Sequence, residues 1–166
     1  MPKATHDSET PAHGRQVLSA TAFIHRTIDG VTKVFLPKRA ATKKFLPGVF
    51  ELPGGHIGYG EDLVAGLKRE IDEEFGVAIT VGDPFFVFDY TNPVKGSHSI
   101  EVIYFATLVG SPEDITIHPE DHSTFDWFAK EDLPKLYSEK KTADDPEFQA
   151  LVKAFELLEG GRPNFG

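Results

Sequence analysis

The sequence contains no cysteine, and this absence excludes several kinds of chemistry. Without a thiol there is no disulfide framework, no thiol nucleophile and no thiolate zinc site. No apolar run approaches the roughly 20 residues that a helix needs to cross a bilayer. The first fifteen residues are polar and lack the apolar segment of a signal peptide. We therefore expect a cytoplasmic protein that does not bind membranes.

Basic residues are also scarce, because 17 Lys and Arg stand against 26 Asp and Glu, for a formal net charge of -9. Proteins that bind duplex nucleic acid need a basic surface for the phosphates, so this charge argues against such a role. The 166 residues, 40% of them hydrophobic, suffice for one well-buried core. We expect a single domain over residues 16–160, between a flexible polar tail at 1–15 and a C-terminal tail at 161–166.

Apolar and β-branched segments alternate with turn signals along most of this domain. Asp29-Gly30 separates the segments 16–26 and 31–36 and predicts a β-hairpin. Further strands are predicted at 77–81, 84–90, 99–109 and 124–128, with Gly82-Asp83-Pro84 as a turn between the first two. Residues 49–55 read as a short strand that runs into a glycine turn.

Two helices are predicted between and after these strands. The first begins near Glu61 and Asp62 and ends at Gly76, a residue type that commonly terminates helices. The second has Asp145 as its cap and Pro146 at its first position, and it ends at Gly160-Gly161. Strands with helices before and after them predict an α/β protein whose sheet is covered on both faces.

The first helix carries an unusual concentration of acidic side chains. Glu70, Glu73 and Glu74 are three and four residues apart, so they share one helix face. Like charges at this spacing repel and weaken an isolated helix. A compensating cation is therefore expected, and hard oxygen ligands indicate Mg²⁺ or Mn²⁺ rather than zinc.

The spacing of these residues resembles the Nudix box, G-x5-E-x7-R-E-U-x-E-E-x-G-U, where U is a bulky aliphatic residue. Every fixed position is filled in this chain, by Gly55, Glu61, Arg69, Glu70, Ile71, Glu73, Glu74, Gly76 and Val77. The preceding Leu52-Pro53-Gly54 also matches the family's usual lead-in. The resemblance covers about residues 16–158. Within the family, the chain resembles MutT-like proteins.

The resemblance to Nudix hydrolases implies an α/β/α sandwich with a mixed sheet, and hydrolysis of a nucleoside diphosphate linked to another group. It implies that Glu70, Glu73 and Glu74, with the carbonyl of Gly54, hold one or more divalent cations. Arg69 would pair with Glu61 and hold the loop against the helix. Bound metals would offset the charge that builds on the phosphoryl oxygens and would lower the pKa of the attacking water.

The general base is open between a box glutamate and a carboxylate of a downstream loop. Glu120 is the preferred candidate outside the box, with Asp121 and Asp126 as alternatives. Its segment also carries His118 and His122, which can transfer protons near neutral pH.

Substrate contacts are expected from basic residues outside the box. Residues 37–47 are bounded by prolines and read as an exposed loop, whose cations Lys38, Arg39, Lys43 and Lys44 could meet a phosphate-bearing ligand. Arg39 and Lys44 are the predicted contacts. The same charges would equally suit a solvated loop. His56, directly after the glycine pair, is either a phosphate contact or a bystander.

Three functions remain open. Hydrolysis of a nucleoside triphosphate, as in house-cleaning of damaged nucleotides, is the leading hypothesis. Cleavage of ADP-ribose or of a nucleotide sugar is the alternative, suggested by Pro93 downstream of the box. A non-catalytic sensing or interaction module is the third, although no box glutamate has been lost. The partner in each case is a small nucleotide, and the resemblance leaves a homodimer open.

Overall fold

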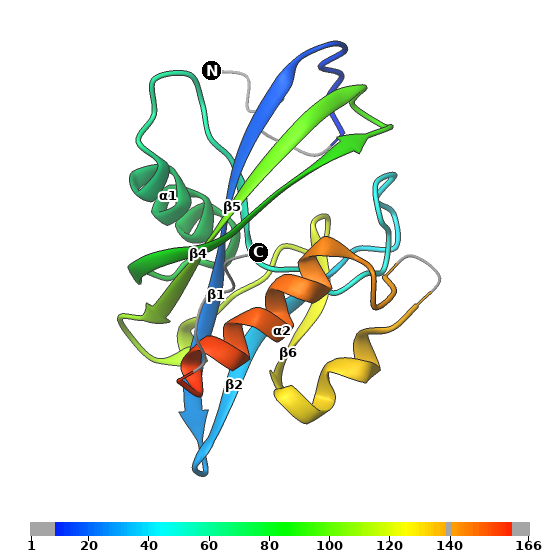
Figure 1. Ribbon diagram of the computed structural model, residues 1–166. Helices are drawn as coiled ribbons and strands as arrows, with labels where there is room; N and C mark the ends of the chain where they lie inside the picture. The colour runs from blue at the N-terminus through cyan, green and yellow to red at the C-terminus, as the bar shows by residue number, and fades with distance from the viewer. Residues whose placement is uncertain (1–8, 139–140, 161–166) are drawn as a thin grey trace.

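A mixed β-sheet forms the centre of the protein. Figure 1 shows the computed structural model, which describes residues 9–138 and 141–160. The strands follow the order β4-β5-β1-β2-β6, and the short β3 pairs with β1. Only β1 and β5 run parallel, while the other pairs are antiparallel. The strand bounds are β1 Gln16–Ile28, β2 Val31–Arg39, β3 Gly54–His56, β4 Ile79–Asn92, β5 Ser97–Leu108 and β6 His122–Ala129.

Helices cover the two faces of this sheet, which confirms the predicted α/β sandwich (Figure 1). The helices are α1 (Leu63–Phe75) and α2 (Pro146–Leu158), with the short 3₁₀ helices η2 (Pro112–Asp114) and η3 (Lys130–Leu136). Because successive strand residues point to opposite faces, β1 contributes to both cores. Phe23 packs on the α2 side, whereas Ala22 and Ile24 pack on the α1 side.

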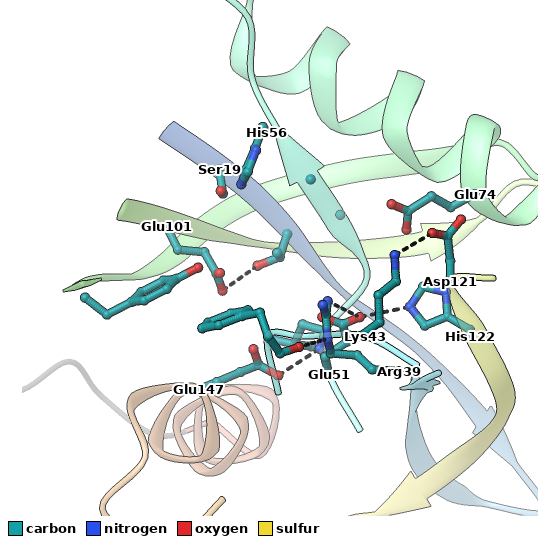
Figure 2. Close-up of a pocket in the computed structure, with 16 residues that line it drawn as sticks. Ser19, Arg39, Lys43, Glu51, His56, Glu74, Glu101, Asp121, His122 and Glu147 are labelled. Carbon is teal, nitrogen blue, oxygen red and sulfur yellow. Dashed lines mark hydrogen bonds and ion pairs between the residues drawn. The ribbon is translucent and has the colours of Figure 1, made fainter. Parts of the chain in front are cut away.

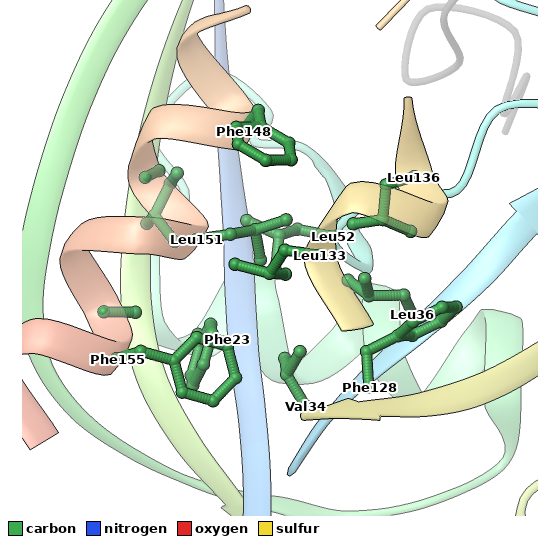
Figure 3. Close-up of a cluster of buried hydrophobic side chains, with 13 residues drawn as sticks. Phe23, Val34, Leu36, Leu52, Phe128, Leu133, Leu136, Phe148, Leu151 and Phe155 are labelled. Carbon is green, nitrogen blue, oxygen red and sulfur yellow. The ribbon is translucent and has the colours of Figure 1, made fainter. Parts of the chain in front are cut away.

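Large apolar side chains fill the core on the α2 side. Figure 3 shows that α2 and η3 both turn side chains toward the sheet. The labelled members are Phe23, Val34, Leu36, Leu52, Phe128, Leu133, Leu136, Phe148, Leu151 and Phe155. The α1 side uses small alanines on β1 opposite Leu67, Ile71 and Phe75 of the helix. Both faces of the sheet are therefore buried, and α1 is fixed at close range to β1.

Both predicted helices begin at the expected caps, and α1 also ends at the expected glycine, whereas α2 ends at Leu158 with Glu159 as its cap and the predicted Gly161 lies outside the described residues. The Asp62 carboxylate accepts a hydrogen bond from the Ala65 amide at 2.9 Å, and Gly76 ends α1 with φ of 68°. The Asp145 carboxylate likewise accepts from the Phe148 amide at 3.0 Å. The hairpin turn is also confirmed, since Asp29 and Gly30 both have positive φ between β1 and β2. These features are local, so short sequence signals suffice to place them.

Three other local predictions are wrong. Residues 82–84 are no turn, because β4 continues through them and absorbs the irregularity as register shifts on either side of Pro84. The predicted loop at 37–47 begins too early, since β2 extends through Arg39. Pro37 fits this strand because the pairing of β2 with β1 ends at Val34. The strand expected before the glycines is reduced to a single bridge between Lys38 and Phe50, followed by β3.

Part of the expected N-terminal tail lies against the turn between β4 and β5. The Ala12 amide donates to the Lys95 carbonyl at 2.8 Å, and the His98 amide donates to the Arg15 carbonyl at 2.9 Å. The C-terminal tail at 161–166, like residues 1–8, lies outside the described residues. Over the part of the chain that the structure describes, no helix has the length and apolar character needed to span a membrane.

Candidate active site

Two glycines on β3 bring the chain close to both β1 and α1. Gly54 has φ of 152°, and a Cβ there would meet the Ala20 carbonyl of β1. A Cβ on Gly55 would instead meet the carboxylate of Glu70. Glycine at these positions therefore lets the strand pass between β1 and the helix, with the Glu70 carboxylate packed against its backbone.

Arg69 connects this loop to the helix through several hydrogen bonds. Its Nε donates to Glu61 Oε2 at 2.7 Å, and its Nη2 donates to Glu61 Oε1 at 3.0 Å. The same Nη2 reaches the His56 carbonyl at 3.2 Å, and Glu61 Oε1 also accepts from the Gly58 amide at 3.0 Å. The hydrogen bonds to Glu61 are the main cause that raises the pKa of Arg69. The pair expected from the sequence is thus present and braces the loop.

The same guanidinium also contacts two further glutamates of the box. Arg69 Nη1 donates to Glu70 Oε1 at 2.9 Å and to Glu73 Oε2 at 3.2 Å. Glu70 is buried, whereas the Glu73 side chain is 37% exposed. One cation therefore faces three carboxylates, which leaves the cluster with excess negative charge.

Glu74 faces a polar cavity beside this cluster. The cavity is lined by residues that are far apart in the sequence, namely Ser19, Thr21, Arg39, Lys43, Phe45, Glu51, Leu52, Gly54, Gly55, His56, Glu74, Tyr90, Glu101, Asp121, His122 and Glu147. Burial raises the pKa of Glu74 well above its usual range, and the carboxylates of Glu51, Glu70 and Asp121 raise it further. The Glu74 carboxylate therefore lacks enough positive charge nearby to stabilise its ionised form.

A buried ion-pair group forms one wall of the cavity. Glu51 Oε2 accepts from His122 Nε2 at 2.9 Å, and Glu51 Oε1 lies 3.3 Å from Arg39 Nη1. Burial opposes the charge on Glu51, but Arg39 and His122 outweigh it and lower the pKa of that carboxyl. The sequence suggested that Arg39 belongs to an exposed loop, and this prediction is wrong. Arg39 is buried at the end of β2 and lines the cavity.

Of the predicted site residues, Arg39, Gly54, His56 and Glu74 line the cavity, whereas Glu61, Arg69, Glu70, Glu73, Lys44 and Glu120 do not. For Lys44 and Glu120, a neighbour in the sequence lines the cavity instead. Lys44 and Glu120 are exposed and do not belong to the lining. Lys43 and Asp121 do, and they form an ion pair with Nζ and Oδ1 3.0 Å apart. His56 is buried and belongs to the lining as well.

The far end of the cavity contains a second acidic group that sequence reasoning missed. Figure 2 shows Glu74 and Asp121 at one end, and Glu101 and Glu147 away from them. Glu147 Oε1 accepts from Lys141 Nζ at 2.9 Å and from the Leu52 amide at 2.8 Å. No signal in the sequence indicated this group, because Glu101 alternates with Ile100 and Val102 as a solvent-facing strand residue would, yet it is buried in β5.

The donor set at the box end fits a hard divalent cation. Within residues 9–138 and 141–160, no three His, Asp or Glu side chains converge closely enough to hold an ion as they stand. Nevertheless, Glu70, Glu73 and Glu74 supply carboxylate oxygens, and the cavity also exposes Gly54. The raised pKa of Glu74 indicates a site that a cation would stabilise. Carboxylate and carbonyl oxygens of this kind suit hard divalent ions.

Comparison with known proteins gives relatives with the same kind of domain. The model of the NUDIX domain matches residues 17–151. The uncharacterized Nudix hydrolase YfcD of Escherichia coli K12 is 35% identical over 77 residues, which are 43% of this chain and 41% of that protein. The aligned part of the chain thus spans less than half the length of this relative.

Solved structures cover more of the chain. The MutT NUDIX hydrolase from Burkholderia pseudomallei is 27% identical, with a TM-score of 0.64 over 84% of this chain and 98% of that one. The Ap4A hydrolase of C. elegans, in a binary complex, is 25% identical, with a TM-score of 0.67 over 88% and 99%. Since the family model covers most of the sequence and its box residues form the cluster around Arg69, the chain belongs to the NUDIX domain family.

Proposed function

We propose that this protein is a divalent-metal-dependent pyrophosphohydrolase that cleaves a phosphoric anhydride bond of a nucleoside triphosphate. The observation that carries the proposal is the Glu74 carboxylate, which faces a polar cavity amid other carboxylates that raise its pKa. The Mg²⁺ or Mn²⁺ that accompanies a triphosphate would supply the missing positive charge. Glu70, Glu73, Glu74 and the Gly54 carbonyl would hold the metal, which would lower the pKa of the attacking water and offset charge on the phosphoryl oxygens.

The protein's own residues supply positioning and charge. Arg69 and Glu61 keep Glu70 and Glu73 in place, so these glutamates approach the metal in fixed orientations. Arg39 and Lys43 bring positive charge to the cavity and would face the negative phosphates. His56 lies beside the glycines and would contact the same phosphates.

Asp121 is the better placed of the two loop carboxylates to act as a general base. A base must lie within hydrogen-bond reach of the water that it deprotonates, or act through one further water. Asp121 lines the cavity and lies close enough to Glu74 to raise its pKa, whereas the exposed Glu120 does not line the cavity. We therefore prefer Asp121 over the initial candidate Glu120, with a box glutamate as the alternative.

The names of the structural relatives support a nucleotide substrate. One of them is called an Ap4A hydrolase, and this name states a nucleotide substrate. The case for ADP-ribose is weaker, because Pro93 is explained by a turn in which the Asn92 side chain accepts hydrogen bonds from the Val94 and Lys95 amides. A sensing module remains the alternative of another class, in which the same cavity would bind a nucleotide without turnover.

Chromatography of the products formed from a panel of nucleotides tests the proposal, because a triphosphate would yield a nucleoside monophosphate and pyrophosphate. The panel contains nucleoside triphosphates, a dinucleoside polyphosphate and ADP-ribose, each with Mg²⁺. We expect turnover of at least one triphosphate and a loss of about 100-fold or more in kcat for Glu73→Gln. Asp72→Asn is the matched control, because Asp72 is exposed on the same helix and is not a box residue. Binding without any turnover by the parent would favour the sensing module, and full activity of Glu73→Gln would refute the metal assignment.

A further inference from the structure

The cavity has two chemically different ends. The box end contains Gly54, Gly55, Glu74 and Asp121, where the proposed metal and phosphates belong. At the other end lie Phe45, Tyr90, Glu101 and Glu147, which also line a more apolar cavity of about 220 Å³ that adjoins it. A substrate whose phosphates occupy the box end would extend its remaining group toward this second end (Figure 2).

Two stacked aromatic rings lie at this end. The rings of Phe45 and Tyr90 are nearly parallel, with an interplanar angle of 8° and centroids 6.0 Å apart. Both residues line both cavities, although Phe45 comes from the segment after β2 and Tyr90 comes from β4. Aromatic faces of this kind bind planar rings by stacking, and any of the nucleobases can stack on them.

Glu101 is a buried carboxyl that lines the same two cavities as these rings. It is 6% exposed, and Thr21 Oγ1 donates to its Oε2 at 3.2 Å. Burial, and then the nearby Glu147 carboxylate, raise the pKa of Glu101 well above its usual range, despite opposition from Thr21 and Lys141. The neutral acid is thus the favoured form, and it carries one O–H donor beside one carbonyl acceptor.

Each nucleobase has an edge that complements such a group. A ring nitrogen or carbonyl that accepts a hydrogen bond lies next to an N–H that donates one, so a single neutral carboxyl can satisfy both atoms. A sugar or an alkyl group lacks both this flat paired edge and the face that stacks. The shape and the hydrogen-bonding pattern of this end therefore both fit a nucleobase.

We propose that Glu101, with the Phe45 and Tyr90 rings, forms the site that recognises the nucleobase of the substrate. Glu101 is assigned as a specificity-determining residue that binds the base and takes no part in bond cleavage. The inference rests on the proposed function in one respect, which is that the bound nucleotide is also hydrolysed. Binding of a nucleoside monophosphate tests the site itself.

The test compares AMP, GMP, CMP and UMP with ribose 5-phosphate, which has the same phosphate and sugar but no base. Titration calorimetry on the full chain with Mg²⁺ gives each dissociation constant. We expect at least one monophosphate to bind about tenfold or more tightly than ribose 5-phosphate. Glu101→Gln should retain this ratio, because an amide also presents a donor beside an acceptor. Glu101→Met has a similar volume without these groups, so the ratio should fall to near one.

Kinetics separate recognition from catalysis and from folding. For a hydrolysed triphosphate, Glu101→Met should raise KM about tenfold and leave kcat largely unchanged, whereas the control Glu159→Gln at the exposed end of α2 should alter neither. An unchanged base preference in Glu101→Met, or an equal loss in Glu101→Gln, would overturn the inference. If Glu101→Met fails to fold by circular dichroism, Phe45→Leu tests the stacking half of the site by the same ratio. A parent that binds bases through Glu101 but hydrolyses no nucleotide would refute the proposed function alone.

Discussion

Arg69 controls the placement of the box glutamates because it bonds to three of them and to the loop backbone. A lysine keeps the charge but lacks the planar fork that reaches several acceptors at once. We therefore expect Arg69→Lys to reduce kcat/KM by about 10- to 100-fold, a range typical of residues that orient metal ligands. Steady-state kinetics with the hydrolysed nucleotide would measure the loss. Lys68→Arg, at an exposed position of α1, is the control, and an equal loss in both variants would contradict the argument.

The carboxyl of Glu101 gives the stability of the protein a defined pH dependence. Its folded-state pKa is raised above the usual value of 4.5, so above that pH the folded protein keeps a proton that the unfolded chain has lost. Stability therefore falls as the pH rises from about 4.5 toward the folded-state pKa. The charged groups that face Glu101 are Glu147, Glu51 and Lys141.

Substitution of Glu101 should remove this loss of stability at higher pH. Glu101→Gln has no proton to release, so its melting temperature relative to the parent should increase between pH 4 and pH 8. Thermal unfolding followed by circular dichroism at several pH values would measure the difference. A constant difference across this range would show that Glu101 ionises in the folded protein as readily as in the unfolded chain.

At the scale of the element, the two glycines of the short strand β3 differ in role. Gly54 is expected to support the fold, and Gly55 is expected to support activity. Gly54→Ala places a methyl group against the Ala20 backbone at a positive φ, which should destabilise the fold by on the order of 1–3 kcal/mol. Gly55→Ala instead meets the flexible end of Glu70, which can move at little expense to the fold. We expect a clear fall in melting temperature for Gly54→Ala and about a tenfold loss of activity with a near-parental melting temperature for Gly55→Ala. The reverse pattern would disprove this division.

Elements defined by local signals could be predicted, and those defined by distant contacts could not. The caps at Asp62 and Gly76 and the turn at Asp29-Gly30 depend on neighbouring residues, so the sequence contains all that determines them. Pro84 looks like a turn residue, yet pairing with β5 carries β4 through it. Lys43 and Asp121 are 78 residues apart, and only the pairing of β2 with β6 brings their segments together. The box was therefore visible from the sequence, whereas most of the cavity around it was not.

At the scale of the whole molecule, divalent metal should couple to folding through the acidic cluster. A ligand that binds only the folded state stabilises it, by about 2.7 kcal/mol when its concentration is 100 times the dissociation constant. We expect Mg²⁺ or Mn²⁺ to raise the melting temperature of the parent by several degrees and EDTA to reverse the change. Glu74→Gln should respond much less to metal, yet be more stable than the parent without it, because one buried repulsion is gone. Glu113→Gln, at an exposed position in η2, should behave like the parent in both conditions.

The division of β1 between two cores has a consequence for how such a protein can diversify. Glu70, Glu73 and Glu74 lie on α1, which packs on one face of the sheet, whereas Glu147 lies on α2 and Thr21 shares the other face with Phe23. Mutations that reshape the α2 side can therefore accumulate without moving α1. Descendants of one ancestor could exchange one preferred nucleotide for another while inheriting the same means of breaking the bond.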